Sequence, residues 1–307
     1  MQSVQPPTDG KIVQKTGLGK FYWGNSTQLL ASTLGASLTG KVQLILTSPP
    51  FPLNHKKSYG NLNGNFYEKW FSDLAPTFAD LLTPTGSIVI EMGNAWMPDR
   101  PVQSLLHLES LIAFVKNPKA KLRLCQQFIC YNPSRLPSPA QWVTVKRIRT
   151  TDSFTNIWWM AKTDFPKADN RRVLRPYSAS MKELLKRKTY NAGRRPSEHQ
   201  ISKRGFLVKH RGSIVPNFLE LDPMTPDRAV RLPNAFSLSN TNSNDFFFRQ
   251  CRERKVIPHP ARMPVGLSTF FIQFLTAAGG ITKTNRISRN TRKRGVTIGL
   301  MRISRRF

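Results

Sequence analysis

Short apolar runs alternate along the chain with longer segments in which apolar residues recur at helical spacing. Residues 42–46 and 87–92 form two brief runs rich in branched side chains, so both are predicted to be buried strands. Between them, residues 65–82 show the spacing of an amphipathic helix. Its apolar positions are Phe66, Trp70, Leu74, Phe78, Leu81 and Leu82. A strand, a helix and a strand in this order favour a parallel sheet, which binds ligands beyond the carboxyl ends of its strands.

The flanking segments extend this pattern into one large α/β domain. Residues 21–23 are predicted to form a short strand, and Gly24 followed by Ser26 as a helix N-cap predicts a strand-to-helix turn. Residues 103–115 are predicted to form a further helix. Residues 122–131 and 155–161 resemble strands, and the segment between them lacks the length and pattern of a crossover helix. We therefore expect these two strands to form an antiparallel hairpin with an elaborated loop.

The first strand ends abruptly in Thr47-Ser48-Pro49-Pro50-Phe51. Two prolines cannot continue the strand, and they hold the residues before them in an extended conformation. A hydroxyl, a backbone carbonyl and an aromatic ring are thereby placed at fixed separations, which suits a flat ring that carries an amino group, such as a nucleobase. The alternative is an ordinary proline turn after a strand.

Charge points to a polyanionic partner. The chain of 307 residues holds 47 Lys and Arg against 17 Asp and Glu, a formal net charge of +30, so nucleic acid is the default partner. A ribosomal or chromatin protein would also be basic, but six Trp and nineteen Phe indicate a folded core. Residues 162–255 hold 21 basic and 9 acidic residues among Pro, Gly and Ser, and they are the candidate for target recognition. Arginines can bind guanine edges bidentately, whereas lysines mostly contact phosphate.

Cysteine usage and the amino-terminal segment suggest a cytoplasmic protein. Cys125, Cys130 and Cys251 show neither metal-ligand spacing nor a disulfide pattern, so we expect reduced thiols. No apolar leader and no run approaching about 18 apolar residues is present, so no membrane span is expected. His259 lacks a cluster of partner His or Cys residues, so no metal site is predicted.

Two motifs resemble a known family. Ser48-Pro49-Pro50-Phe51 resembles the S-P-P-[FY] motif of DNA methyltransferases that act on amino groups, in particular the N4-cytosine enzymes of type II restriction–modification systems. The hexapeptide at residues 259–264, HPARMP, is similar to the H-P-A-[RK]-x-P segment of the permuted, PvuII-type branch of that family. The order of segments from residue 21 to residue 280 also follows this branch.

The resemblance implies a class I methyltransferase (Rossmann-like) sheet, S-adenosylmethionine as the cofactor, double-stranded DNA as the substrate and a restriction endonuclease as the functional counterpart. Its implied catalytic residues are Ser48, Pro49, Pro50 and Phe51. Its implied cofactor contacts are Asn25, Ser26, Thr47, His259, Pro260, Arg262 and Pro264. Candidate DNA contacts are Lys56, Lys57, Arg135, Lys146, Arg147, Arg194, Arg195, Lys203 and Arg204. Serine before the two prolines favours N4-cytosine over N6-adenine, where Asp or Asn is usual.

The expected organisation has five parts, of which the last departs from the family. These are a flexible arm (1–20), a catalytic α/β domain (21–161), an inserted basic recognition region (162–255), a cofactor-side helix (256–280) and an aberrant tail (281–307). The tail has 9 Lys and Arg and no Asp or Glu, and it lacks the D-P-F-x-G-x-[GN]-T-T loop of the family. We therefore expect a sheet without its central cofactor strand, from a truncated or frameshifted gene, and impaired activity.

The sequence is also compatible with three other functions. A catalytically inactive DNA-binding remnant fits the missing glycine loop, and an RNA-directed amino-methyltransferase fits the positive charge. An N6-adenine methyltransferase is the third alternative. Cofactor binding distinguishes the remnant from an enzyme, and competition between duplex DNA and structured RNA distinguishes the RNA-directed enzyme.

Overall fold

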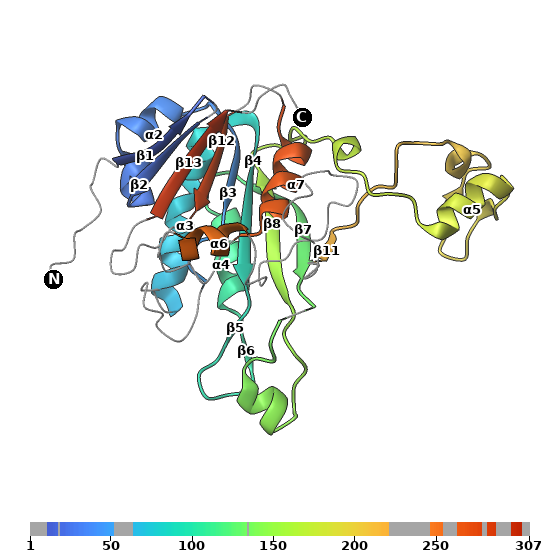
Figure 1. Cartoon of the computed structure of the whole chain (residues 1–307), viewed down its shortest axis with the longest axis horizontal. Coiled ribbons are helices and arrows are strands. Elements are labelled where there is room, and N and C mark those ends of the chain that lie inside the picture. The colour runs from blue at the N-terminus through green and yellow to red at the C-terminus, as the bar shows by residue number, and fades with distance from the viewer. Residues whose placement is uncertain are drawn as a thin grey trace.

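A nine-stranded mixed sheet organises the computed structural model (Figure 1), which describes residues 11–17, 19–51, 64–133, 135–220, 246–253, 263–277, 281–286 and 296–302. The strands lie in the order β1 (Lys11–Thr16), β2 (Gly19–Gly24), β13 (Val296–Arg302), β12 (Ile281–Arg286), β3 (Val42–Thr47), β4 (Leu82–Gly93), β8 (Phe154–Ala161), β7 (Arg123–Tyr131) and β11 (Phe218–Glu220). The helices are α1 (Ser26–Ala31), α2 (Thr33–Leu38), α3 (Gly64–Leu81), α4 (Leu106–Val115), α5 (Ala179–Arg187), α6 (Phe246–Glu253) and α7 (Val265–Leu275).

The sheet is buried on both faces, and alternate residues of the central strands serve opposite layers. In β4, Ile88 and Ile90 pack in one core with residues of α1, α2, α3 and α4, whereas Val89 packs in a second core with α7. Successive side chains of a strand point to opposite faces. A strand that is covered on both faces is therefore apolar at successive positions, which explains the continuous apolar runs in the sequence.

Most of the strands and helices predicted for residues 21–161 are confirmed. Strands β3 and β4 are parallel and are joined through α3, and β7 and β8 form the expected antiparallel hairpin. The predicted face of α3 is wrong at its start, because Phe66 is 78% exposed while Tyr67 and Phe71 are buried. The helix predicted at 103–115 begins at Leu106, after the short strand β6 (Gln103–Ser104).

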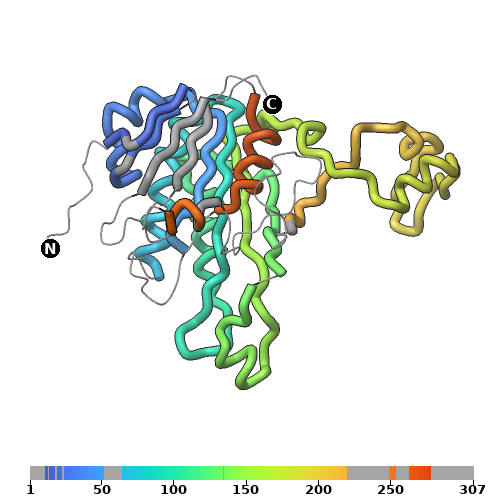
Figure 2. The backbone as a smooth tube through the Cα atoms, in the orientation of Figure 1, coloured from blue at the N-terminus to red at the C-terminus, as the bar shows by residue number. Residues whose placement is uncertain are grey.

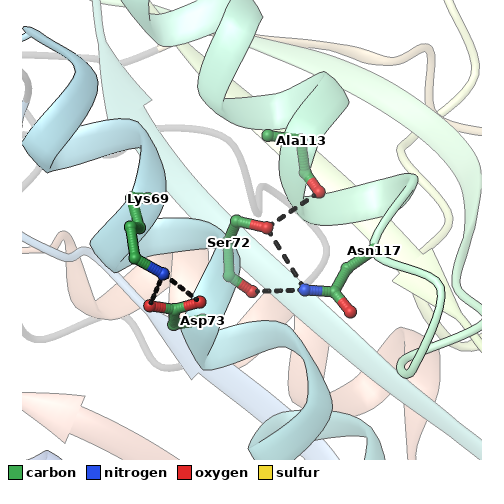
Figure 3. Close-up of polar contacts among 5 residues, drawn as sticks. All are labelled: Lys69, Ser72, Asp73, Ala113 and Asn117. Atoms are coloured by element: carbon green, nitrogen blue, oxygen red, sulfur yellow. Dashed lines mark hydrogen bonds and ion pairs between the residues drawn. The ribbon is translucent and has the colours of Figure 1, made fainter.

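Polar contacts hold α3 against α4 (Figure 3). The Ser72 hydroxyl donates to the Ala113 carbonyl at 3.1 Å, and the Asn117 amide donates to the Ser72 carbonyl at 3.0 Å. The neighbouring ion pair of Lys69 and Asp73, at 3.1 Å, is solvent-exposed, so it contributes little to stability. The two helices therefore stay in register as a layer beneath β3 and β4.

The expectation that the central strand is missing is wrong. Strand β12 lies parallel to β3, with Thr284 opposite Leu46, and β13 fills the space between β12 and β2 in antiparallel orientation. A β-ladder is formed by backbone groups, so a segment that departs from the family sequence can still occupy this position. The sheet also covers α7, because Phe270 and Phe271 pack in one core with Leu44 and Leu46 of β3.

The amino-terminal segment differs from the expected flexible arm. Residues 11–16 form β1, which pairs with β2 in an antiparallel hairpin at the edge of the sheet. Residues 1–10 and 18 lie outside the described residues. Within the described ranges, every helix is too short or too polar to reach across a lipid bilayer.

Two parts project from the sheet (Figures 1 and 2). The first, called the lobe below, consists of β5 (Ala95–Trp96), β6, the turn between them and the connection 132–153 that joins β7 to β8. The second, called the basic arm, consists of residues 174–211 with α5, β9 (Gly193–Arg194) and β10 (Gln200–Ile201). None of the residues 174–211 is buried, so the basic arm has no hydrophobic core of its own.

Candidate active site

Residues 48–51 leave β3 at the carboxyl edge of the sheet, directly after the buried Thr47. The Tyr67 hydroxyl of α3 donates to the Pro50 carbonyl at 2.7 Å. Two prolines restrict the backbone of this loop, and the bond from Tyr67 fixes its end against the helix layer. The loop is thereby held rigidly over the ends of β3 and β4.

The ring of Phe51 lies directly against the backbone of Gly93, the last residue of β4. A Cβ atom at position 93 would lie 2.6 Å from Cε2 and 2.7 Å from Cδ2 of that ring. No side chain fits at this distance, so glycine is required if the ring is to keep its place. The neighbouring strand therefore determines how Phe51 is oriented.

A buried carboxyl group lies beside the loop. Glu91 is 6% exposed, it shares a hydrogen bond with Ser48, and the Thr155 hydroxyl donates to Glu91 Oε1 at 3.3 Å. Burial raises the pKa of Glu91 to about 7, although the Thr155 bond, the positive charge of Arg135 and the Ser48 bond each act to lower it. Such a carboxyl can hold or release a proton near neutral pH.

A chain of polar side chains, of which Asn94 and Asn156 are buried, continues along the same edge. Gln127 donates to Asn156 at 3.0 Å, Asn156 donates to Asn94 at 2.8 Å, and Asn94 donates to Asp152 at 2.9 Å. The chain connects β7, β8, the end of β4 and the lobe. Because each member has a partner, the polar groups hold the carboxyl ends of these strands in one arrangement.

Asn25 and Ser26, two expected cofactor contacts, follow β2 on the same edge. The prediction that Ser26 is the N-cap is wrong, because Asn25 Oδ1 accepts bonds from the Thr27 N–H at 3.0 Å and the Thr27 hydroxyl at 2.7 Å. Asn25 has φ −74°, so it is not in the left-handed conformation. Three strand spacings separate β2 from β3, so the two strands lie roughly 14 Å apart across the sheet.

The remaining candidate residues fall in different places. Arg135 lies near Glu91, because its Nη1 donates to the Phe154 carbonyl at 2.9 Å and its positive charge acts on the Glu91 carboxyl. Pro264 is buried at the start of α7. Lys146 and Arg147 are exposed on the lobe, and Arg194, Arg195, Lys203 and Arg204 are exposed on the basic arm. Lys56, Lys57, His259, Pro260 and Arg262 lie outside the described residues.

The sequence prediction missed the residues that support the loop, namely Tyr67, Glu91, Gly93 and Thr155. Residues 91–94 were interpreted from the sequence as the end of a strand, but no role was assigned to Glu91 itself. A signal existed, since a carboxyl inside an otherwise apolar strand is costly to bury without partners. The partners could not be identified, because Ser48 and Thr155 lie far from it in the chain.

The raised pKa of Glu91 predicts a pH-dependent difference in stability for Glu91→Gln. The folded state binds the carboxyl proton more tightly than the unfolded state, so the parent loses stability as pH rises from about 4.5 to about 7. Glutamine resembles the protonated acid. The variant should therefore match the parent near pH 4 and exceed it by about 3 kcal/mol above pH 8 in denaturant unfolding. Glu109→Gln, at an exposed position of α4, is the control. A stability difference between Glu91→Gln and the parent that stays constant at all pH values would contradict the assignment.

Comparison with known proteins agrees with this architecture. The sequence profile of the DNA methylase family matches residues 42–283. The type II methyltransferase M.PvuII of Proteus hauseri is 37% identical over 268 residues, which are 87% of this chain and 73% of that protein. The solved structure of the cytosine-N4-specific PvuII DNA methyltransferase superposes with a TM-score of 0.61 and 30% identity, covering 91% of this chain and 76% of that chain. The chain therefore belongs to the DNA methylase family of amino-group methyltransferases.

Proposed function

We propose that this chain transfers a methyl group from S-adenosylmethionine to the N4 amino group of cytosine in double-stranded DNA. The observation that carries the proposal is the arrangement at the ends of β3 and β4, where Ser48 contacts the buried Glu91 and the ring of Phe51 lies on Gly93. The similarity to a cytosine-N4-specific methyltransferase supports cytosine over adenine.

The proposed chemistry uses hydrogen-bond acceptors. The N4 lone pair of cytosine is delocalised into the ring, so the amino group is a poor nucleophile. Ser48 Oγ and the Pro49 carbonyl would accept its two hydrogens, which favours a pyramidal nitrogen with its lone pair free to react. The extruded base would stack on Phe51. S-adenosylmethionine, held by the cofactor contacts proposed below, would supply the electrophilic methyl group to this nitrogen.

Glu91 would accept the proton that the reaction releases. When ionised, Glu91 accepts the Ser48 hydroxyl hydrogen, which leaves the Ser48 oxygen as an acceptor towards the amino group. The methylated nitrogen must then lose a proton, and Ser48 can pass one to Glu91. A pKa of about 7 suits an acceptor that must take and release a proton near neutral pH.

The basic arm and the lobe would contact the DNA. The basic arm carries eleven Lys and Arg against two Asp and Glu, all partly or fully exposed. It joins the body where Arg175 and Ser213 exchange backbone bonds of 3.0 and 2.8 Å. We assign residues 162–255 to target recognition, with Arg194, Arg195, Lys203 and Arg204 as DNA contacts. By analogy with its type II relative, the enzyme would act in the cytoplasm and protect DNA from a cognate restriction endonuclease.

We further propose that cofactor affinity is weak. In a Rossmann-like site, a strand leads through a glycine-rich loop into a helix whose N-terminus faces the cofactor. Strand β12 instead pairs in antiparallel orientation with β13, the next described strand, whereas a crossover helix joins parallel strands. The tail also has no acidic residue for a ribose. Asn25, Ser26, Thr47, His259, Pro260, Arg262 and Pro264 remain the proposed cofactor contacts.

Replacing Ser48 tests the chemical step. With saturating cofactor and duplex DNA, the parent should form N4-methylcytosine, identified by mass spectrometry of hydrolysed DNA. Ser48→Ala should lower the rate by about 10²–10³, the cost of one acceptor aligned in the transition state, with DNA affinity unchanged. Ser37→Ala, on the exposed helix α2, is the matched control. A parental rate for Ser48→Ala, or N6-methyladenine as the product, would contradict the proposal.

Replacing Gly93 tests the orientation of Phe51. In Gly93→Ala the new Cβ cannot remain 2.6 Å from the ring, so Phe51 must move. Displacing the stacking ring by about 1 Å should lower the methylation rate by about 10²-fold. Gly17→Ala is the control, because no atom lies within 4 Å of the Cβ that it adds. A parental rate in folded Gly93→Ala would mean that the ring does not position the base.

Calorimetric titration with S-adenosylmethionine tests the cofactor side. We expect a dissociation constant of about 1 mM or weaker, equivalent to roughly 4 kcal/mol of binding free energy. Thermal unfolding of the same sample shows whether the protein is folded. A micromolar constant would mean that the β12–β13 segment forms an effective cofactor site and that the proposed impairment is wrong.

A further inference from the structure

The lobe is a rigid projection beside the candidate active site. The Arg149 guanidinium carbon lies 3.3 Å from the centre of the Trp96 ring, and Arg149 Nη1 donates to the Pro101 carbonyl at 3.2 Å. These contacts fasten the connection 132–153 to the β5–β6 turn. At its base, the Asn132 N–H donates to the Ser153 carbonyl at 2.8 Å. The lobe extends from the carboxyl edge of the sheet, the edge that holds Ser48 and Glu91 (Figures 1 and 2).

Large apolar side chains of the lobe are exposed next to cations. Leu136 is 80% exposed, Val145 is 74% exposed and Ile148 is 60% exposed, and the exposed Lys146 and Arg147 lie between the last two. Single exposed apolar residues need no explanation, but several on one rigid projection suggest a binding surface. The flanking positive charges favour a polyanion as the partner.

Among these apolar residues, Leu136 is the one whose neighbours in the chain contact the residues around the Glu91 carboxyl. The preceding Arg135 donates to the Phe154 carbonyl, and its charge acts on Glu91. Phe154 is followed by Thr155, and the Thr155 hydroxyl donates to Glu91 Oε1. The following Pro137 restricts the Leu136 backbone to an extended conformation. Leu136 is therefore held next to the residues that surround the Glu91 carboxyl, with its side chain in solvent.

We propose that Leu136 enters the DNA duplex and fills the space left by the extruded base. The proposal rests on the proposed function, because only an enzyme that acts on an extruded base leaves such a space. Extrusion breaks the stacking of the target base with its neighbours, and an apolar side chain inserted between base steps offsets part of that cost. Lys146 and Arg147 then contact the phosphates that flank the opened step.

The test compares an intact short duplex with the same duplex carrying one abasic site. The probe lacks a base at one position, so Leu136 can enter without the cost of extrusion. The parent should bind the abasic duplex about tenfold more tightly, equivalent to about 1.4 kcal/mol. Leu136→Ala should lose this preference, because alanine is too short to fill the space that the missing base leaves. Fluorescence anisotropy gives both constants.

Two variants control for exposed apolar surface. Ile112→Ala removes a side chain that is 52% exposed on α4, outside the lobe, and should keep the tenfold preference. Val145→Ala removes a different apolar side chain of the lobe and should keep it too. Retention of the preference in Leu136→Ala, its loss in Val145→Ala, or its absence in the parent would each overturn the proposal. Failure of the parent to bind any duplex would instead contradict the proposed function.

Discussion

Burial of one carboxyl group at the edge of the sheet constrains the whole candidate site. Removing Glu91 from water is costly, and hydrogen bonds and charge from the surrounding protein reduce that cost. Its partners come from three separate segments: Ser48 from the loop after β3, Thr155 from β8 and Arg135 from the lobe. The four groups stay close only if β3, β4 and β8 keep their register. The same register places Phe51 on Gly93, so the carboxyl and the aromatic ring depend on one arrangement of strands.

The parts of this arrangement that could be predicted were those encoded by local pattern. The apolar runs at β3 and β4, the proline loop and the β7–β8 hairpin each follow from short stretches of sequence. The face of α3 was mispredicted at Phe66, because the residues at 66 and 67 are both aromatic and helical spacing alone does not choose between them. The contact between Glu91 and its partners depends on pairing across the sheet, which no local pattern contains.

Strand β12 was mispredicted for a different reason. The tail of the chain lost the family motif, and we inferred from this that the strand itself was lost. The segment ITKTNR nevertheless supplies backbone donors and acceptors, and three of its six residues are β-branched, which is typical of strands. Loss of a binding motif and loss of a strand are thus separate events. A sheet position tolerates many sequences, whereas a loop that must approach a cofactor closely tolerates few.

Because the cofactor-binding motif can be lost while the strand remains, the two halves of the sheet are constrained differently. From β3 to β7, the groups that would act on a base are held by hydrogen bonds among buried and half-buried residues, and none of these bonds involves β12 or β13. On the other side, β12 continues into an antiparallel neighbour, so the chain returns along the sheet where a cofactor-binding unit would cross through a helix. The catalytic half can therefore keep its geometry while the cofactor half changes. The proposed DNA contacts depend on neither half directly, because the exposed cations of the lobe and the basic arm lie beyond the core of the sheet.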